Sequence, residues 1–96
     1  MQEARVPDDV LAEVGELLAI PSVSADPGRD GDVRAACAWV CRYVEAAGGA
    51  AELAAGGRLG TGRLRASGGG DAATVVLYGH VDVQPPEPLE LWRTPP

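Results

Sequence analysis

The chain's one histidine stands two positions before an aspartate, directly after an apolar run. Residues 74–78 read Thr-Val-Val-Leu-Tyr, and Gly79-His80-Val81-Asp82 follow. On an extended backbone, side chains two positions apart point to the same side. A carboxylate beside an imidazole fixes its tautomer and leaves the other ring nitrogen for a metal ion or a proton-transfer partner. His80 is therefore the candidate metal ligand, and Asp82 is the candidate catalytic residue that orients it.

Both residues also have an ordinary structural interpretation. A lone histidine at a strand end is commonly a hydrogen-bonded structural residue, and an aspartate close to prolines commonly forms an Asx turn. The spacing of His80 and Asp82 is what favours the chemical interpretation over the structural one.

The other nucleophilic side chains favour structural roles. Cys37 and Cys41 lie four positions apart on an apolar stripe of a predicted helix, where thiols are commonly buried in the core. A zinc site that combines them with His80 is a less favoured alternative, because the spacing is not CxxC and a second ligand pair is lacking. Ser22 and Ser24 lie in a loop without a glycine-framed elbow, which favours turn and capping roles over nucleophilic catalysis.

Residues 74–78 are typical of a strand that is buried on both faces of a parallel sheet. Sites in such sheets lie beyond the carboxyl ends of the strands, where His80 follows. Residues 52–54 and 63–66 are weaker candidate strands, and Trp39 is expected at the edge of a helix-to-sheet contact. The expected fold class is α/β, with two amino-terminal helices packed on the first strands of a mostly parallel sheet.

Two helices are predicted from apolar positions that recur at helical spacing. The first follows Pro7 and ends near Ile20, because the proline after Ile20 disfavours helical geometry. The second begins with Asp30 or Asp32 as its cap and ends where Gly48 and its glycine neighbour supply a stop.

Length, charge and hydropathy limit the classes of function. The 96 residues suffice for one small domain or for part of one, so residues 1–96 are expected to belong to a single domain. The formal net charge is -6 and lysine is absent, which argues against nucleic acid as a partner. No apolar stretch reaches the roughly 20 residues that cross a bilayer, and residues 1–9 lack the features of a secretory signal. We therefore expect no nucleic-acid partner, no membrane partner and a cytoplasmic location.

A longer stretch around His80 resembles a known family. Residues 75–86 read Val-Val-Leu-Tyr-Gly-His-Val-Asp-Val-Gln-Pro-Pro, and Leu91-Trp92 and Thr94-Pro95-Pro96 come after them. Together they resemble the zinc-dependent exopeptidases that include aminoacylase, acetylornithine deacetylase, succinyl-diaminopimelate desuccinylase and the cytosolic and carnosine dipeptidases, with the dipeptidase branch most similar. Residues 17–24 resemble the family's amino-terminal helix and the loop after it, so the resemblance covers nearly the whole chain.

The resemblance implies that residues 1–96 are the amino-terminal portion of an incomplete zinc-exopeptidase catalytic domain. His80 would be a ligand of one of two zinc ions, and Asp82 would orient its imidazole. The complete enzyme would cleave amide bonds of dipeptides or N-acyl amino acids, and a homodimer of that enzyme is left open. The family's other ligands and its general base follow the His-x-Asp motif beyond this chain, so the chain alone is expected to be inactive. The alternative is a non-catalytic remnant that serves as a structural or interaction module.

Overall fold

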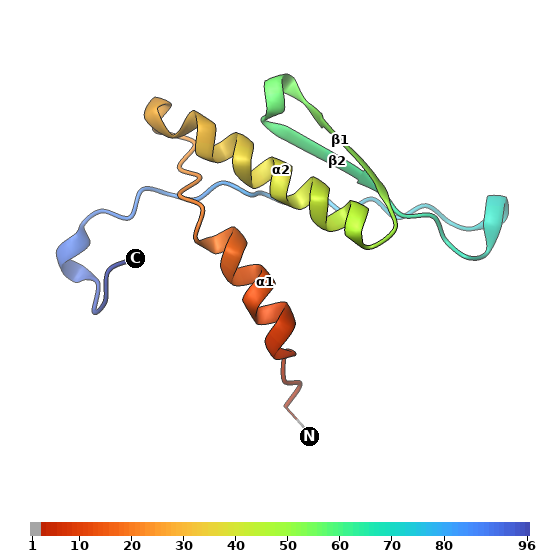
Figure 1. Ribbon diagram of the computed structural model, residues 1–96, viewed down its shortest axis with the longest axis horizontal. Helices are drawn as coiled ribbons and strands as arrows, with labels where there is room; N and C mark the ends of the chain where they lie inside the picture. Colours follow the sequence, from red (N-terminus) through yellow and green to blue (C-terminus); the bar gives the residue numbers. More distant parts are fainter. Residues whose placement is uncertain (1–2) are drawn as a thin grey trace.

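The computed structural model describes residues 3–96, which form two α-helices, a β-hairpin and short 3-10 turns (Figure 1). The helices and strands are α1 (Asp8–Leu18), α2 (Asp30–Ala46), β1 (Ala50–Ala54) and β2 (Leu59–Arg63). The 3-10 turns are Pro27–Arg29, Ala55–Gly57, Gly69–Asp71 and Leu89–Leu91. Within residues 3–96, no helix combines the length and the apolar character that a membrane crossing requires.

Helix α1 forms where the sequence predicts it, but its apolar stripe stays uncovered. Pro7 occupies the N-cap position, and two aspartates fill the first turn, where the helix dipole favours negative charge. The helix ends at Leu18, slightly before Ile20, because the chain must leave helical geometry ahead of Pro21. No α1 residue is buried, and Leu11 on the apolar stripe is exposed.

Helix α2 provides most of the buried core. It begins at Asp30, but neither Asp30 nor Asp32 caps it as predicted. Instead, the Asp30 carboxylate forms ion pairs with Arg34, one turn further along, and with Arg58. The helix ends as predicted, with Gly48 in the left-handed conformation at a φ of 92°. The buried α2 residues are Val33, Ala36, Cys37 and Cys41.

The hairpin packs on α2 through glycines. Strands β1 and β2 pair antiparallel, with Ala50 opposite Arg63. A side chain at Gly60 would lie 3.2 Å from the sulfur of Cys41, so the glycine lets the helix approach the strand closely. Strand β2 lies at Leu59–Arg63 and not at the predicted residues 63–66, because Gly60 and Gly62 are strand residues that pack against α2.

The prediction of a mostly parallel sheet is wrong. In residues 3–96 the one sheet is the two-stranded antiparallel hairpin, and only α2 of the two helices packs on it extensively. Residues 74–78 are extended but belong to no strand, and the side chains from Val75 to Tyr78 are between 79% and 92% exposed. A strand buried on both faces needs hydrogen-bonded neighbours and a layer on each side, and this segment has neither. Parallel pairing is limited to one isolated bridge, between Val23 and Val83.

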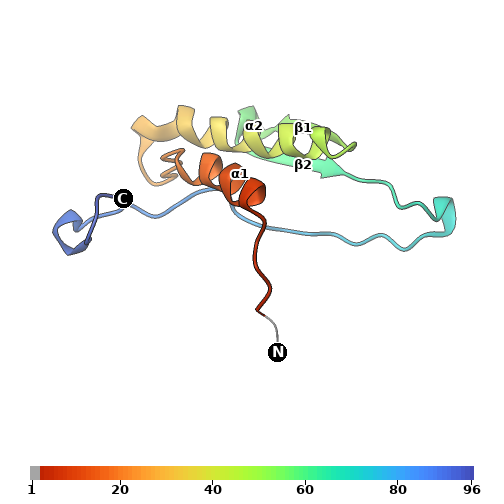
Figure 2. The same cartoon turned by 60° about the horizontal axis from the view of Figure 1, so that its bottom comes forward.

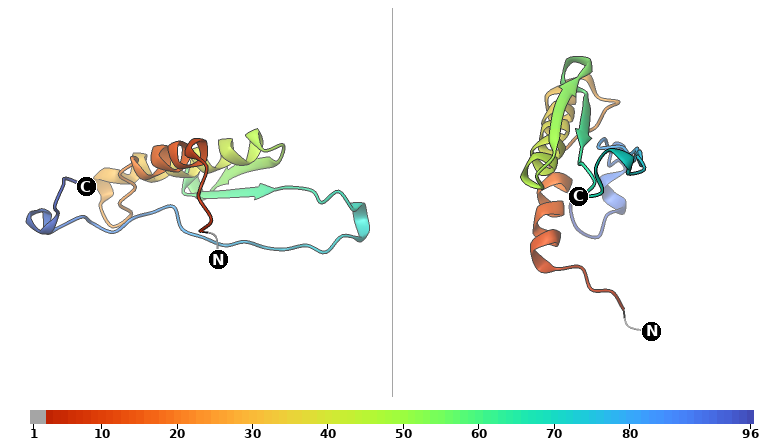
Figure 3. Two further views of the ribbon diagram at one scale, coloured as in Figure 1. Left: turned by 90° about the horizontal axis from the view of Figure 1, so that it is seen from below. Right: turned by 90° about the vertical axis from the view of Figure 1, so that its right-hand side faces the viewer.

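The carboxyl-terminal third runs away from the packed unit. Figures 2 and 3 show the chain leaving β2, turning at Gly69–Asp71 and returning as an extended segment that passes the hairpin and α2 at a distance. The radius of gyration is 16.4 Å, whereas a compact domain of this length has a value of about 12 Å. Helix α2 and the hairpin are therefore the compact part of the molecule.

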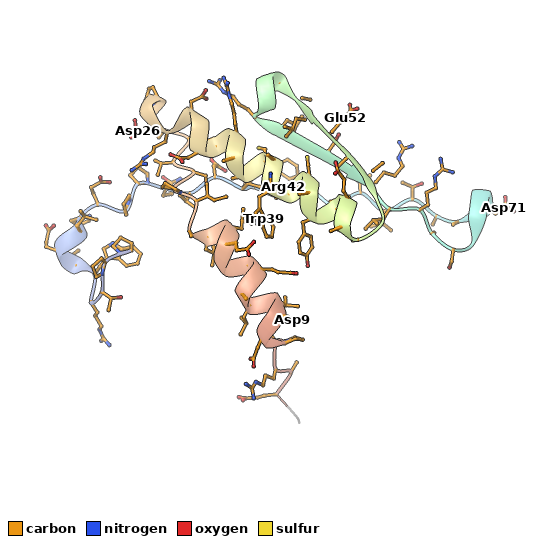
Figure 4. The ribbon with its side chains drawn as sticks, in the orientation of Figure 1. Asp9, Asp26, Trp39, Arg42, Glu52 and Asp71 are labelled. Carbon is orange, nitrogen blue, oxygen red and sulfur yellow. The ribbon has the colours of Figure 1, made fainter. Side chains whose placement is uncertain are left out.

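Trp39 joins the two helices and does not lie at a helix-to-sheet edge as predicted. Its indole Nε1 donates to a carboxylate oxygen of Glu16 in α1 at 3.2 Å, and its ring stacks on Tyr43 with centroids 5.2 Å apart. Figure 4 shows Trp39 projecting from α2 toward α1. The contact between Trp39 and Glu16 is a single polar one, so it orients α1 but does not bury the apolar stripe of that helix.

Candidate functional site

The structure brings His80 and Asp82 together on one side of the extended segment. Nδ1 of His80 lies 3.4 Å from Oδ1 of Asp82, and the two side chains are 71% and 36% exposed. An ionised carboxylate only accepts hydrogen bonds, so the favourable partner for Oδ1 is a protonated Nδ1. This arrangement leaves Nε2 as the ring nitrogen with a lone pair for a metal ion or a proton.

Asp82 is held from its other oxygen by a serine. Oγ of Ser24 donates to Oδ2 at 2.6 Å, so the two carboxylate oxygens serve different partners. This hydrogen bond is the main cause that lowers the pKa of Asp82 below its ordinary value. Desolvation opposes it, whereas a backbone hydrogen bond of Asp82 and the charge of His80 lower the pKa further. Asp82 is therefore ionised at neutral pH and available as an acceptor.

The loop after α1 holds the segment that carries the pair. The backbone N–H of Val83 donates to the carbonyl of Ser22 at 3.0 Å, and Oγ of Ser22 donates to the carbonyl of Val81 at 2.8 Å. Ser22 is 1% exposed, so its hydroxyl is shielded from water, whereas Val83 is 41% exposed. Ser22 and Ser24 thus hold the His80 segment, a role that the sequence prediction of turns and caps missed. Their spacing of two, the same as that of the His-x-Asp pair, is the signal that could have suggested it.

Tyr78 covers the free nitrogen of His80. The Tyr78 hydroxyl lies 3.4 Å from Nε2, and the two rings meet edge to face with centroids 5.2 Å apart. Residues 78, 80 and 82 alternate onto one side of the extended backbone, which explains the contact. Tyr78 is 85% exposed, so its side chain can turn away and leave Nε2 accessible at little cost.

The two cysteines do not join His80 in a metal site. Both are free and buried, and the Cys41 thiol contacts the carbonyl of Glu52 at 3.6 Å. Burial is the main cause that raises the pKa of the Cys37 thiol, followed by its proximity to Cys41 and to Asp82. A protonated thiol is a poor metal ligand. Cys37 and Cys41 are core residues, and within residues 3–96 they form no group of three potential metal ligands with His80.

An open gap separates the His80 segment from the packed unit. Its volume is 1780 Å³, and it is bounded by the apolar face of α2, by β2 and by residues 72–82. Both His80 and Asp82 line it. The pair therefore faces a space and is not packed against the core, and its orientation depends on the contacts that it makes with Tyr78 and Ser24.

Residues 3–96 fit part of a zinc centre and not a whole one. The exposed imidazole with a carboxylate behind it has the chemistry of one oriented ligand. Catalytic zinc generally takes three protein ligands, and the described residues contain no group of three or more His, Cys, Asp or Glu side chains placed to hold a metal ion. Comparison of the chain with protein-family models, with curated proteins and with solved structures gives no match.

Proposed function

We propose that residues 1–96 are the amino-terminal part of the catalytic domain of a dipeptidase-like zinc metallohydrolase. The substrate class is dipeptides or N-acyl amino acids, the bond that is cleaved is an amide, and the location is the cytoplasm. The observation that supports the proposal is the contact of His80 Nδ1 with a carboxylate that Ser24 holds from its far side. The proposal also draws on the resemblance of the sequence around His80 to that family of exopeptidases.

In the proposed function, the chain contributes one oriented ligand. Asp82 accepts from Nδ1–H of His80 and makes Nε2 a better electron-pair donor. His80 would hold a zinc ion through Nε2, and the ion would supply Lewis-acid chemistry toward a scissile carbonyl. Because residues 3–96 hold one such ligand and no group of three, the chain alone is expected to bind zinc weakly and to hydrolyse no dipeptide.

Zinc titration of the full chain, followed by calorimetry and by NMR, tests this function. We expect weak saturable binding that disappears in His80→Gln and that falls by about 10- to 100-fold in Asp82→Asn. Asp71→Asn is the matched control, because it makes the same chemical change in the distant turn Gly69–Asp71 (Figure 4). Equal binding by the parent chain and His80→Gln would contradict the proposal, as would rapid dipeptide hydrolysis by the chain alone.

A second candidate function is a non-catalytic interaction or structural module. It is favoured by the exposure of the apolar side chains from Val75 to Tyr78 and by the lack of a three-ligand group in the described residues. In this case His80 needs no metal, and the parent chain and His80→Gln show the same response to zinc. The same titration therefore decides between the two candidates.

A further inference from the structure

We propose that Ser24 is a positioning residue for His80 and acts through Asp82. Its hydroxyl fixes the Asp82 carboxylate so that Oδ1 faces Nδ1 of His80, which holds the imidazole in the Nδ1–H tautomer. The inference rests on the proposed function in one respect: the Nδ1–H tautomer leaves Nε2 free, and the proposed function uses Nε2 as the metal ligand. The contact itself stands on the geometry of the three side chains.

The Ser24 contact is the stronger of the two side-chain contacts that Asp82 makes. Its length is 2.6 Å, typical of a hydroxyl that donates to an ionised oxygen, whereas the contact with His80 is 3.4 Å. The His80 side chain is 71% exposed, and an exposed contact of this length contributes little on its own. The His80 contact alone would therefore leave the Asp82 carboxylate free to rotate, and Ser24 supplies the constraint that stops it.

The backbone that carries Ser24, the hydrogen-bond donor, is itself held in place. The backbone just before it is joined to the His80 segment by the bond from Val83 N–H to the carbonyl of Ser22 and by the buried hydroxyl of Ser22, which donates to Val81. The bond from Val83 N–H is part of the isolated parallel bridge between Val23 and Val83. The donor and the acceptor therefore sit on two backbone segments in a defined register, so the bond from Ser24 is part of a fixed arrangement.

The test reads the tautomer of His80 directly, in the full chain without metal. The ¹⁵N chemical shifts of the imidazole are measured at a pH where the ring is neutral. We expect mostly Nδ1–H in the parent chain and a shift of the population toward Nε2–H in Ser24→Ala. Ser24→Thr and Ser24→Val form a matched pair of nearly equal shape, in which only threonine keeps the hydroxyl, so threonine should retain the parent tautomer and valine should lose it.

Thr61→Ala is the control, because Thr61 is an exposed hydroxyl that bonds to a carbonyl in the hairpin. It should leave the His80 tautomer unchanged. Zinc affinity gives a second measure, and we expect Ser24→Ala and Ser24→Val to lose about tenfold or less, at or below the low end of what partners of a metal ligand contribute.

The inference is overturned if valine and threonine at position 24 give the same tautomer population, or if Ser24→Ala leaves the parent population unchanged. A shift of the tautomer in valine but not in threonine supports it even if the parent chain binds no zinc. In that outcome the zinc function fails while the positioning role of Ser24 stands, so the two failures are distinguishable.

Discussion

Gly49 joins α2 to the hairpin at a point that has no room for a side chain. A Cβ at this position would lie 2.7 Å from the carbonyl oxygen of Arg63 and 2.7 Å from a methyl group of Val44, whereas Cβ atoms essentially never come within 3.0 Å of such neighbours. Arg63 is paired with Ala50 at the end of the hairpin ladder. The carbonyl can withdraw only if this end of the ladder separates, so Gly49→Ala is expected to destabilise the packed unit.

The size of the effect follows from two opposing contributions. Overpacking of a well-packed site costs about 1–3 kcal/mol. Alanine also restricts the unfolded chain, which offsets about 0.4–1 kcal/mol. The net expectation for Gly49→Ala is a loss of about 1–2 kcal/mol in the free energy of unfolding, or roughly a 5- to 30-fold fall in the ratio of folded to unfolded chain.

Urea unfolding followed by far-ultraviolet circular dichroism measures this difference. Gly31→Ala is the matched control, because Gly31 lies in α2 and a Cβ there meets nothing within 4 Å. It removes a poor helix former and is expected to stabilise the chain by up to about 1 kcal/mol. If Gly49→Ala proves as stable as Gly31→Ala, the close approach of α2 to the hairpin is refuted.

Three further predictions concern the site and its surroundings. Tyr78→Phe removes the hydroxyl that lies 3.4 Å from Nε2 of His80 and should raise zinc affinity by about twofold, the value of one exposed hydrogen bond, as measured by calorimetry. Because the folded-state pKa of the Cys37 thiol is raised above its ordinary value of 9.0, its contribution to stability is complete below pH 9.0 and is lost as the pH rises through the raised value. Unfolding titrations across that range should show the decline, and Cys37→Ala should abolish this component. Residues 74–78 expose apolar side chains on a backbone that is not paired in a sheet. The chain should therefore self-associate with rising concentration, and Leu77→Asp should reduce the association. Light scattering that shows equal mass for both proteins would contradict this expectation.

Local sequence patterns were sufficient to place the two helices and the stop of α2, but not the cap of α2 or the roles of Ser22 and Ser24. The acidic first turn after Pro7 and the proline after Ile20 bound α1, and the left-handed Gly48 ends α2. Cys37 and Cys41 were predicted to be core residues, and both are buried. These features depend on residues within a turn or two of one another, which is why the sequence contains enough information to predict them.

In the candidate site, the short-range contact was predictable from the sequence and the long-range one was not. That His80 and Asp82 share a side follows from their spacing of two on an extended backbone, and the structure shows their contact. The hydroxyl of Ser24 is 58 positions away from Asp82 in the chain, and its short bond to that carboxylate has no local sequence signal beyond the alternation of Ser22 and Ser24. Only the docking of the two segments decides it.

The amino-acid sequence by itself determined that there are two helices and roughly where they lie, that residues 74–78 are apolar and extended, and that an imidazole and a carboxylate face the same way after them. Only the tertiary structure decided what those residues touch. An apolar run indicates that a segment could form a buried strand. Whether it does so depends on the backbone edges and helix faces that pack against it, and the residues that form these lie far away in the chain. The parallel sheet expected from residues 74–78 is therefore replaced by an antiparallel hairpin and one isolated bridge.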